Sequence, residues 1–334
     1  ASLKKLNVDF TLQKMATAGE LHTYLCLMNS HTLKIAFRGA GSGLEQEAKV
    51  KAIYEAIEDS LLYQTLSYLN ENLISMFSTQ SSPSTQFLQQ NELLPAVLNE
   101  EAFLKNPYPW LKLKKLHSNS EVIYYPLSLV FPHASHIDDF NKYVDQHPLS
   151  QMANSTGLAM GATAAEALIH GINDWIERDA YGLFLLSTII KNNKPARCLL
   201  KPTLPDSIQK NIAVIENTYN DELMVIDITS NFTIPAFFVS FTKQNVPVQP
   251  SGLGASLCRE DALQQALLEA LQARDRFNSN TISARQKTLR YYKKYPLLLK
   301  AFQCDLNELR KKGCIVNISW NEIISHQVDR KSVV

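Results

Sequence analysis

The sequence predicts an α+β fold, in which β-sheets pack against helices, and three observations carry this prediction. Residues 163–180 place apolar side chains at helical spacing, with no proline and a single glycine, Gly171. Two further stretches, around Gly43 and Gly254, show the same order of glycines followed by a helical pattern. Short apolar runs bounded by turn residues, such as residues 223–228, are typical of strands.

The bulk composition is that of an ordinary globular chain. Of the 334 residues, 45% are hydrophobic and 19% are charged. The net charge is +1, from 33 basic and 32 acidic residues, so it gives no electrostatic argument for nucleic acid or a membrane surface as a partner. The apolar run at residues 183–190 is too short to span a bilayer.

The cysteines are widely spaced and include no CxxC pair, so they predict neither a zinc site nor a disulfide framework. They are Cys26, Cys198, Cys258, Cys304 and Cys314. We therefore expect a cytoplasmic protein in a reducing compartment.

The N-terminal part is expected to begin with a hairpin of strands at residues 21–28 and 33–37. A glycine cluster at residues 39–43 follows. Such a cluster between a strand and a helix could cradle a phosphate through backbone N–H groups, although it matches no Walker or dinucleotide fingerprint. The next helix is expected over residues 45–62.

The middle of the chain carries weaker signals. We expect a second helix at residues 73–77, helical structure at 91–105 and a strand at 121–131 that is edged or interrupted by proline. His133 and His136 have no acidic or sulfur partner at helpful spacing, which favours exposed histidines over a metal site.

The C-terminal part alternates helices and strands after the central stretch. A helix is expected at residues 207–219, followed by strands at 223–228 and 236–241. Beyond the third glycine-led stretch, residues 288–312 are expected to be helical, ending at a glycine before a strand at 314–320.

Acidic side chains recur at matching positions in the three glycine-led stretches. Each has a small residue, another four later, an acid three beyond that, and an acid or amide three further on. These are Ala48, Ala52, Glu55 and Glu58; Ala167, Gly171, Asp174 and Glu177; and Ala262, Ala266, Glu269 and Gln272. An isolated acidic pair at this spacing is typical of a solvated helix face. The recurrence instead favours three helices that direct like groups to one place.

Two physical consequences follow from this pattern. The small residues would let helices and strands approach closely. Five carboxylates brought together would repel one another and need cations, and clustered carboxylate oxygens suit a hard ion such as Mg²⁺.

The three stretches resemble the signature regions of the YcaO family. The central one is similar to the family pattern SNGLAAGNT…EA…G…E.iERDA at Ser155, Gly157, Leu158, Ala159, Gly161, Thr163, Glu166, Ala167, Gly171, Ile176, Glu177, Arg178, Asp179 and Ala180. Residues 222–241 also resemble the family's v.v.dlTs..giPv strand pair. The resemblance covers residues 37–320, and several ordered motifs agree.

The resemblance implies a YcaO-like fold, with mixed β-sheets packed with helices around a central ATP cleft and with pseudo-repeated halves. It implies one domain over residues 1–334, whose parts 1–150 and 151–320 share one nucleotide site. The implied activity is ATP- and Mg²⁺-dependent activation, by phosphorylation, of a backbone amide in a peptide or protein. The product would be an azoline, a thioamide or a related modification, as in the biosynthesis of ribosomally made peptides.

ATP and Mg²⁺ are the implied cofactors, and no residue is assigned a catalytic role. The implied magnesium ligands are Glu55, Glu58, Asp174, Glu177 and Glu269, and the nucleotide contacts are Ser155, Glu166, Arg178, Gln272, Arg274 and Lys51. Arg178 suits a phosphate clamp because guanidinium groups match phosphate oxygens bidentately. Lys51 has two interpretations: it neutralises Glu55, one helical turn away, or it reaches a phosphate.

Some positions depart from the family pattern. Thr156 and Ala162 stand where asparagine is usual, Asp174 where glutamate is usual, and Gln265 where many members have arginine. The Pro-rich tail typical of azoline formers is not seen. These departures keep open the alternative of a non-catalytic accessory subunit that binds nucleotide, peptide or a partner protein.

The expected partner is a peptide or protein substrate. Because no segment looks like a leader-binding domain, we expect a separate leader-binding or accessory protein. Neither nucleic acid nor a membrane is expected, and a homodimer is left open, since family members are often dimers but composition favours neither state.

Overall fold

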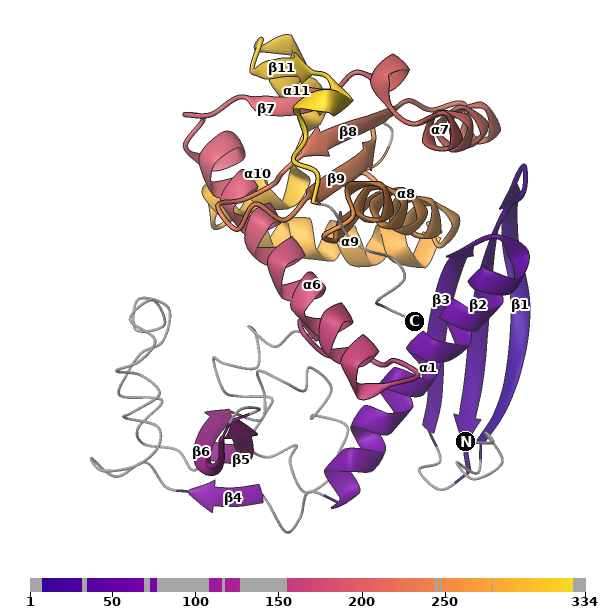
Figure 1. The fold of residues 1–334 in the computed structure, drawn as a ribbon, viewed down its shortest axis with the longest axis vertical. Helices are drawn as coiled ribbons and strands as arrows, with labels where there is room; N and C mark the ends of the chain where they lie inside the picture. The colour runs from indigo at the N-terminus through magenta and orange to yellow at the C-terminus, as the bar shows by residue number, and fades with distance from the viewer. Residues whose placement is uncertain are drawn as a thin grey trace. The chain divides into compact units, whose positions relative to one another are not determined.

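In this computed structural model the described residues form three sheets and a set of helices (Figure 1). The structure describes residues 8–31, 35–68, 73–76, 108–115, 118–126, 155–243, 246, 248–277 and 279–326. The chain divides into two units, the first containing Ala1–Asp59 and Ala159–Val334 and the second Ser60–Leu158. Among the described helices, none combines the length and the apolar character needed to cross a membrane.

A five-stranded sheet lies at the centre of the first unit, in the order β10-β9-β8-β7-β11. Its strands are β7 (Ala196–Leu199), β8 (Leu223–Asp227), β9 (Ala236–Phe241), β10 (Ser251–Ala255) and β11 (Ile315–Ile318). Neighbouring strands pair antiparallel, except that β7 and β11 are parallel. Every residue of β8 and β9 is buried, so the sequence reads as continuous apolar runs instead of an alternating pattern.

The two faces of this sheet carry two hydrophobic cores, because successive strand residues point to opposite faces. Leu223 and Val225 belong to the core formed with helices α7 (Asp206–Tyr219) and α8 (Arg259–Asp275). Met224 and Ile226 belong to the other core. That core includes residues from α6 (Ala164–Phe184), from the π-helical segment η5 (Leu185–Ile190) that continues it, and from α11 (Leu306–Lys311).

A second sheet in the first unit is the antiparallel meander β1 (Val8–Ala18), β2 (Leu21–Ser30) and β3 (Ile35–Gly43). The β2–β3 pair confirms the expected hairpin, whereas β1 has no counterpart among the sequence predictions. Its side chains are exposed or half-buried except at Ala18, so its hydrophobic signal is weak. Helix α8 contacts β9 and β10 as well as β2 and β3, and therefore lies between the two sheets.

The glycines of β3 and β10 lie inside strands and receive the backbone of a helix. A Cβ atom added to Gly39 would lie 2.2 Å from the carbonyl oxygen of Ala52 in α1 (Glu45–Tyr68). A Cβ atom added to Gly252 would lie 2.3 Å from the carbonyl oxygen of Ala266 in α8. The interpretation of residues 39–43 as a phosphate-cradling loop is therefore wrong, because these residues belong to a strand and α1 occupies the space beside them.

The second unit contains the antiparallel sheet β4-β5-β6. Its strands are β4 (Leu73–Met76), β5 (Tyr108–Lys115) and β6 (Ser118–Pro126). The helix expected at residues 73–77 is wrong, since a short apolar run does not distinguish helix from strand and here pairing with β5 decides. The expected strand at 121–131 is β6, which begins earlier and ends at the proline. The helix expected at 91–105, His133 and His136 lie outside the described residues.

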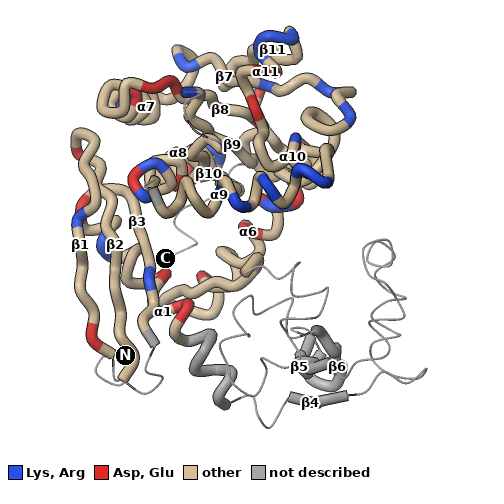
Figure 2. Tube along the Cα trace, turned by 180° about the vertical axis from the view of Figure 1, so that it is seen from behind, with Lys and Arg blue, Asp and Glu red and all other residues tan. Residues whose placement is uncertain are grey.

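The C-terminal helical region is divided, although one helical stretch was expected over residues 288–312. It consists of α9 (Ser279–Tyr292), α10 (Pro296–Gln303) and α11. Pro296 begins α10, and Cys304 ends it in the left-handed conformation, with φ 40°. Figure 2 shows Lys and Arg along α9 and α10. In the sequence, α9 contains Arg285, Lys287 and Arg290, α10 contains Lys300, and Lys293 and Lys294 lie between the two helices.

Candidate functional site

Glu55 of α1 is held by strand β3. Its Oε2 accepts a hydrogen bond from the backbone N–H of Ala40 at 2.8 Å, and the guanidinium of Arg276 lies 3.9 Å from its Oε1. Burial raises the pKa of Glu55, although the Ala40 N–H and Arg276 act in the opposite direction. Lys51 instead pairs with Glu47 at 2.7 Å. The interpretation that Lys51 neutralises Glu55 is therefore wrong.

Glu269 of α8 repeats this arrangement on strand β10. Its Oε2 accepts from the backbone N–H of Leu253 at 2.8 Å. Burial raises the pKa of Glu269, opposed by the Leu253 N–H and by Arg178, while Asp174 and Glu55 raise it further. The same backbone contact thus positions an acid at equivalent points of α1 and α8.

Glu58 lies one turn beyond Glu55 on α1 and contacts the segment that precedes α6. Its Oε2 accepts from the backbone N–H of Met160 at 2.9 Å. Burial raises the pKa of Glu58 to about 7, and the charges of Asp59, Glu55 and Asp174 add to this effect. Glu58 is therefore near both another acid of its own helix and an acid of α6.

The start of α6 is fixed by its capping residues. The side chain of Thr163 accepts from the backbone N–H of Glu166 at 3.2 Å, and the Glu166 carboxylate accepts from the N–H of Ala162 at 2.8 Å. Both contacts satisfy N–H groups at the helix start, as in a capping box. Glu166 thus has a structural role, and its place beside the nucleotide stays a prediction.

About two turns further along α6, Asp174, Glu177 and Arg178 form the acidic end of the site. The Arg178 Nε donates to Asp174 Oδ1 at 3.3 Å. Glu177 is only 3% exposed. Burial raises the pKa of Glu177 to about 8, Glu269 and Asp174 raise it further, and Arg178 opposes them. Burial lowers the pKa of Arg178, but the surrounding carboxylates outweigh this and raise it.

These mutual effects connect the acids of three helices. Glu55 acts on Glu58 and Glu269, Asp174 acts on Glu58, Glu177 and Glu269, and Glu269 acts on Glu177. The five predicted acids and Arg178 are therefore linked by electrostatic effects within the first unit.

The remaining predicted residues are placed less uniformly. Gln272 lies beside Glu55, whose pKa it lowers. Arg274 is directed elsewhere, with its guanidinium 5.3 Å from the ring centre of Tyr219 and 5.8 Å from that of Phe241. Ser155 belongs to the second unit, in a turn where its carbonyl accepts from the N–H of Leu158 at 3.0 Å, and its role stays a prediction.

Arg276 is the site residue that sequence reasoning missed. It lies seven residues after Glu269, so the two share a face of α8. That spacing is a signal in the sequence for Arg276, whereas the nucleotide contact predicted from the sequence is Arg274. The structure shows that the arginine near Glu55 is Arg276.

The cluster offers hard oxygen donors and an excess of negative charge. Glu58 and Glu269 each give one oxygen to a backbone N–H, which leaves the other oxygen for a further contact. Glu55 also gives one oxygen to a backbone N–H, but its other oxygen faces Arg276 at 3.9 Å. Within the described ranges, no three His, Cys, Asp or Glu residues form a group that could hold a metal ion by themselves. A cation here would need water or phosphate oxygens in addition, which is the ordinary coordination of Mg²⁺. The donor chemistry therefore fits Mg²⁺ bound together with a phosphate.

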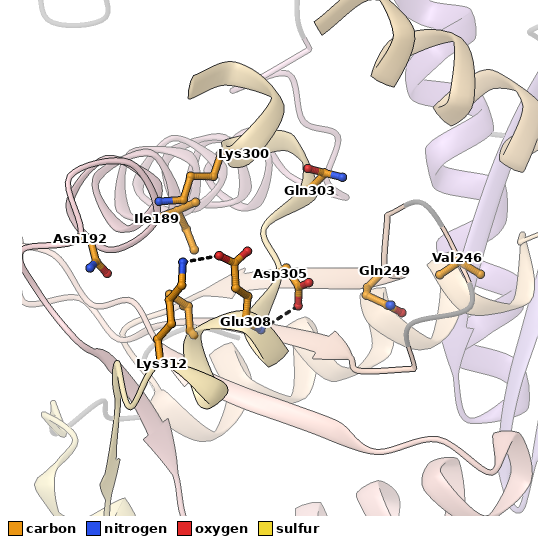
Figure 3. A pocket seen from close by; sticks show the side chains of 10 residues that line it. Ile189, Asn192, Val246, Gln249, Lys300, Gln303, Asp305, Glu308 and Lys312 are labelled. Carbon is orange, nitrogen blue, oxygen red and sulfur yellow. Dashed lines mark hydrogen bonds and ion pairs between the residues drawn. The ribbon is translucent and has the colours of Figure 1, made fainter. Parts of the chain in front are cut away.

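Two cavities of the first unit are lined by other residues. One of about 430 Å³ lies between η5, α10 and α11. Figure 3 shows Lys300 and Lys312 on one side of it, with Lys312 paired to Glu308 and the Asp305 carboxylate accepting from the Glu308 N–H. The other, of about 350 Å³, lies at the end of α6.

Comparison with solved structures shows the fold that this chain shares. A YcaO protein from Methanopyrus kandleri bound with AMPPCP and Mg²⁺ is 19% identical, with a TM-score of 0.56 over 87% of this chain and 69% of that one. A heterocyclase in complex with substrate and cofactor is 18% identical, with a TM-score of 0.59 over 98% of this chain and 46% of that one. A chain of the E. coli microcin synthetase McbBCD complex with pro-MccB17 bound is 13% identical, with a TM-score of 0.59 over 96% and 78%.

Among curated proteins, an uncharacterized protein in the tfuA 3′ region of Rhizobium leguminosarum bv. trifolii is 26% identical over 262 residues. The match covers 74% of this chain and 56% of that protein, so the chain spans about half the length of this relative. The family model described as YcaO cyclodehydratase, ATP- and Mg²⁺-binding, matches residues 39–309. The two ligands in that description agree with the cofactors expected from the sequence. By this match and by its fold, the chain belongs to the YcaO family.

Proposed function

We propose that this protein activates a backbone amide of a peptide or protein substrate in a reaction that depends on ATP and Mg²⁺. The observation that supports the proposal best is the convergence of five carboxylates and Arg178 from α1, α6 and α8. A group of buried like charges destabilises the fold unless cations neutralise it. Such a cluster in a member of an ATP- and Mg²⁺-binding family is suited to hold a nucleotide through its metal ions.

The magnesium ligands in this proposal are Glu55, Glu58, Asp174, Glu177 and Glu269. The backbone N–H contacts fix the carboxylates of Glu55, Glu58 and Glu269 in position before any ligand arrives. A nearby cation would stabilise the charged form of Glu177, which is 3% exposed and has a pKa raised by burial and by other acids.

The arginines would orient the phosphates. Arg178 lies among the acids, and its guanidinium can bind phosphate oxygens bidentately. Arg276, near Glu55, is a second candidate for this role. Bound ATP would supply a phosphoryl group that converts the oxygen of an amide adduct into a leaving group. The nucleophile that forms this adduct would come from the substrate or from solution, and would determine whether an azoline or a thioamide results.

The test is nucleotide binding by calorimetry in the presence of Mg²⁺. Glu177→Gln keeps the shape of the side chain but removes its charge, and should weaken binding roughly a hundredfold. Glu20→Gln is the matched control, because Glu20 is exposed in the turn between β1 and β2. Unchanged affinity in the Glu177 variant would contradict the proposed metal site.

ATP turnover with and without peptide distinguishes an enzyme from an accessory subunit. Stimulation of ATP turnover by a peptide supports amide activation. Nucleotide binding without turnover under all conditions favours the accessory role, which the substitutions at Thr156, Ala162 and Gln265 keep open. A separate protein that presents the substrate is part of the proposal, in line with the multi-subunit microcin synthetase among the structural relatives.

A further inference from the structure

The cavity of about 350 Å³ lies on the α6 face that carries Glu177. Ala180 and Phe184 line it, and they follow Glu177 by three and seven residues, so all three share one side of the helix. Both Ala180 and Phe184 are nearly fully buried, at 1% and 7% exposure. At about 1.5 Å per residue, Ser187 at the far wall lies about 15 Å along the helix from Glu177.

The continuation of α6 into this cavity is a π-helix, Leu185–Ile190. Such segments are uncommon and are frequently found at functional sites. Leu186, Ser187 and Thr188 of this segment line the cavity, together with Leu183 from the last turn of α6. The wall therefore combines hydroxyl groups with two exposed leucines, Leu183 at 44% and Leu186 at 42%.

Positive charge dominates the rim. Lys191, Lys194 and Arg197 line the cavity, and the acidic residue among its lining residues is Asp227. Asp227 is already neutralised, since its Oδ2 lies 2.9 Å from Arg197 Nη1 and its Oδ1 accepts from the N–H of Thr229 at 3.0 Å. Neither lysine forms an ion pair with a residue in the described ranges.

The larger cavity in Figure 3 differs in this respect. Its Lys300 and Lys312 are balanced by Asp305 and Glu308, and Lys312 is paired with Glu308. It therefore offers no net charge by which to choose a ligand. In the cavity at the end of α6, Lys191 and Lys194 can instead contact an incoming anion.

The end of β8 and the β8–β9 connection also line the cavity, through Asp227, Thr229 and Ser230. This segment lies within residues 222–241, which resemble a family motif, and none of its residues takes part in the proposed nucleotide chemistry. Its position is fixed internally, because Thr229 Oγ1 accepts from the N–H of Ala236 at 3.2 Å and Ser230 Oγ from that of Phe232 at 3.4 Å. These two hydrogen bonds hold the shape of the segment that lines the cavity.

We propose that this cavity binds an acidic and partly apolar segment of the peptide substrate. Its carboxylates would contact Lys191 and Lys194, while an apolar side chain would pack against Leu183 and Leu186. The inference rests on the proposed function for its choice of a peptide. Four or five extended residues at about 3.3 Å each would span the roughly 15 Å along α6 between Glu177 and Ser187.

Fluorescence anisotropy with two labelled peptides tests this proposal. One alternates Glu and Leu, and the other alternates Gln and Leu. The wild-type protein should bind the acidic peptide at least about tenfold more tightly at low salt, with the preference shrinking as salt rises. The double variant Lys191→Glu, Lys194→Glu should lose this preference, whereas Lys210→Glu, on an exposed position of α7, should keep it.

Several outcomes would overturn the inference. They are no binding of the acidic peptide, equal binding of the two peptides by the wild-type protein, and an unchanged preference in the double variant. Equal competition by a single-stranded oligonucleotide would also remove the peptide assignment. Nucleotide binding is measured in the same preparations. Absence of nucleotide binding from the wild-type protein would contradict the proposed function. A wild-type protein that binds nucleotide but shows no preference for the acidic peptide would contradict only the role of this cavity.

Discussion

Two regions of the molecule, β3–α1 and β10–α8, share one plan. Each strand packs two glycines against a helix that carries alanines four residues apart. Gly39 lies against Ala52, and Gly252 lies against Ala266. The strand residue after the first glycine donates its N–H to a glutamate, Glu55 or Glu269, at 2.8 Å in both. In both regions a backbone N–H holds the acid in position, so the other side chains can differ without moving it.

The two regions differ in their surroundings and in one side chain. Helix α8 lies between two sheets and buries seven residues, whereas α1 keeps Val50 51% exposed. Three residues after the shared glutamate, α1 has Glu58 and α8 has Gln272. The shared framework therefore supports a helix that is mainly structural and another that adds a second acid to the site.

The largest expected effect comes from filling the helix-strand contact. Gly252→Ala should destabilise the protein by about 3 kcal/mol, because its Cβ would meet backbone atoms of a helix enclosed on two sides. Gly39→Ala meets α1 at a similarly short distance, but α1 has an exposed face and can shift, so we expect a smaller loss. Denaturant unfolding measures both.

Gly182→Ala is the control for these two variants. Gly182 sits within α6, and beyond its own helix no atom of the described residues lies within 4 Å of a Cβ atom added there. Removing a glycine from a helix interior should stabilise by about 0.5–1 kcal/mol. Equal losses for Gly252 and Gly39 would mean that enclosure of α8 makes no difference.

The next effect tests the single exchanged side chain. Glu58→Gln gives α1 the amide found in α8, and should weaken Mg²⁺-dependent nucleotide binding about thirtyfold because a ligand charge is lost. Gln272→Glu makes the reverse change and should lower stability without Mg²⁺, since it adds a further acid beside Glu55. Calorimetry and thermal unfolding with and without Mg²⁺ check the pair. No change in either variant would show that the position after the shared glutamate is irrelevant to the site.

A pH dependence sharpens the same contrast. In the metal-free protein the pKa is about 7 for Glu58 and about 8 for Glu177, so both bind protons that Mg²⁺ must displace. Nucleotide affinity with Mg²⁺ should therefore rise between about pH 6 and about pH 9, by up to roughly a thousandfold when both protons must leave. Glu58→Gln should remove the lower part of this rise and keep the part near pH 8.

The stability of the metal-free protein should change in the opposite direction. A carboxyl whose pKa is raised on folding binds more protons in the folded state than in the unfolded state. Its contribution is therefore present at low pH and is lost as pH rises towards 7 and 8. Thermal unfolding across this range, with Mg²⁺ added back at the high end, measures the effect; an increase of stability with pH would contradict it.

The features that could be predicted from the sequence are those carried by periodic spacing and by repetition. Matching acids on three helices predicted a common location, and the structure brings Glu55, Asp174 and Glu269 together. Strands without alternation were harder. β10 contains the glycines Gly252 and Gly254, and the pattern alone gave no sign that they were strand residues. These glycines allow close contact with α8, a helix that follows them in the sequence.

Local side-chain partners were the least predictable part. Lys51 could pair with Glu47, one turn before it, or with Glu55, one turn after it, and helical spacing favours neither. Arg274 and Arg276 differ by two residues and so point to different sides of α8, towards Tyr219 and towards Glu55. Such choices are decided by the packing of neighbouring elements, which a single sequence does not show.

The smallest expected effect concerns Lys51, whose counterpart at the same position of α8 is Gln265. Lys51 pairs with Glu47 in a contact where both side chains are 46% exposed. Exposed pairs at this spacing contribute only about 0.3–0.5 kcal/mol. Lys51→Gln, which copies the α8 residue, should therefore lower the free energy of unfolding by no more than about 0.5 kcal/mol and change the nucleotide affinity by less than about twofold to threefold. Calorimetry with Mg²⁺ measures the affinity. A loss as large as that in Glu58→Gln would mean that Lys51 leaves Glu47 to reach a phosphate, and that the two regions differ in two functional side chains instead of one.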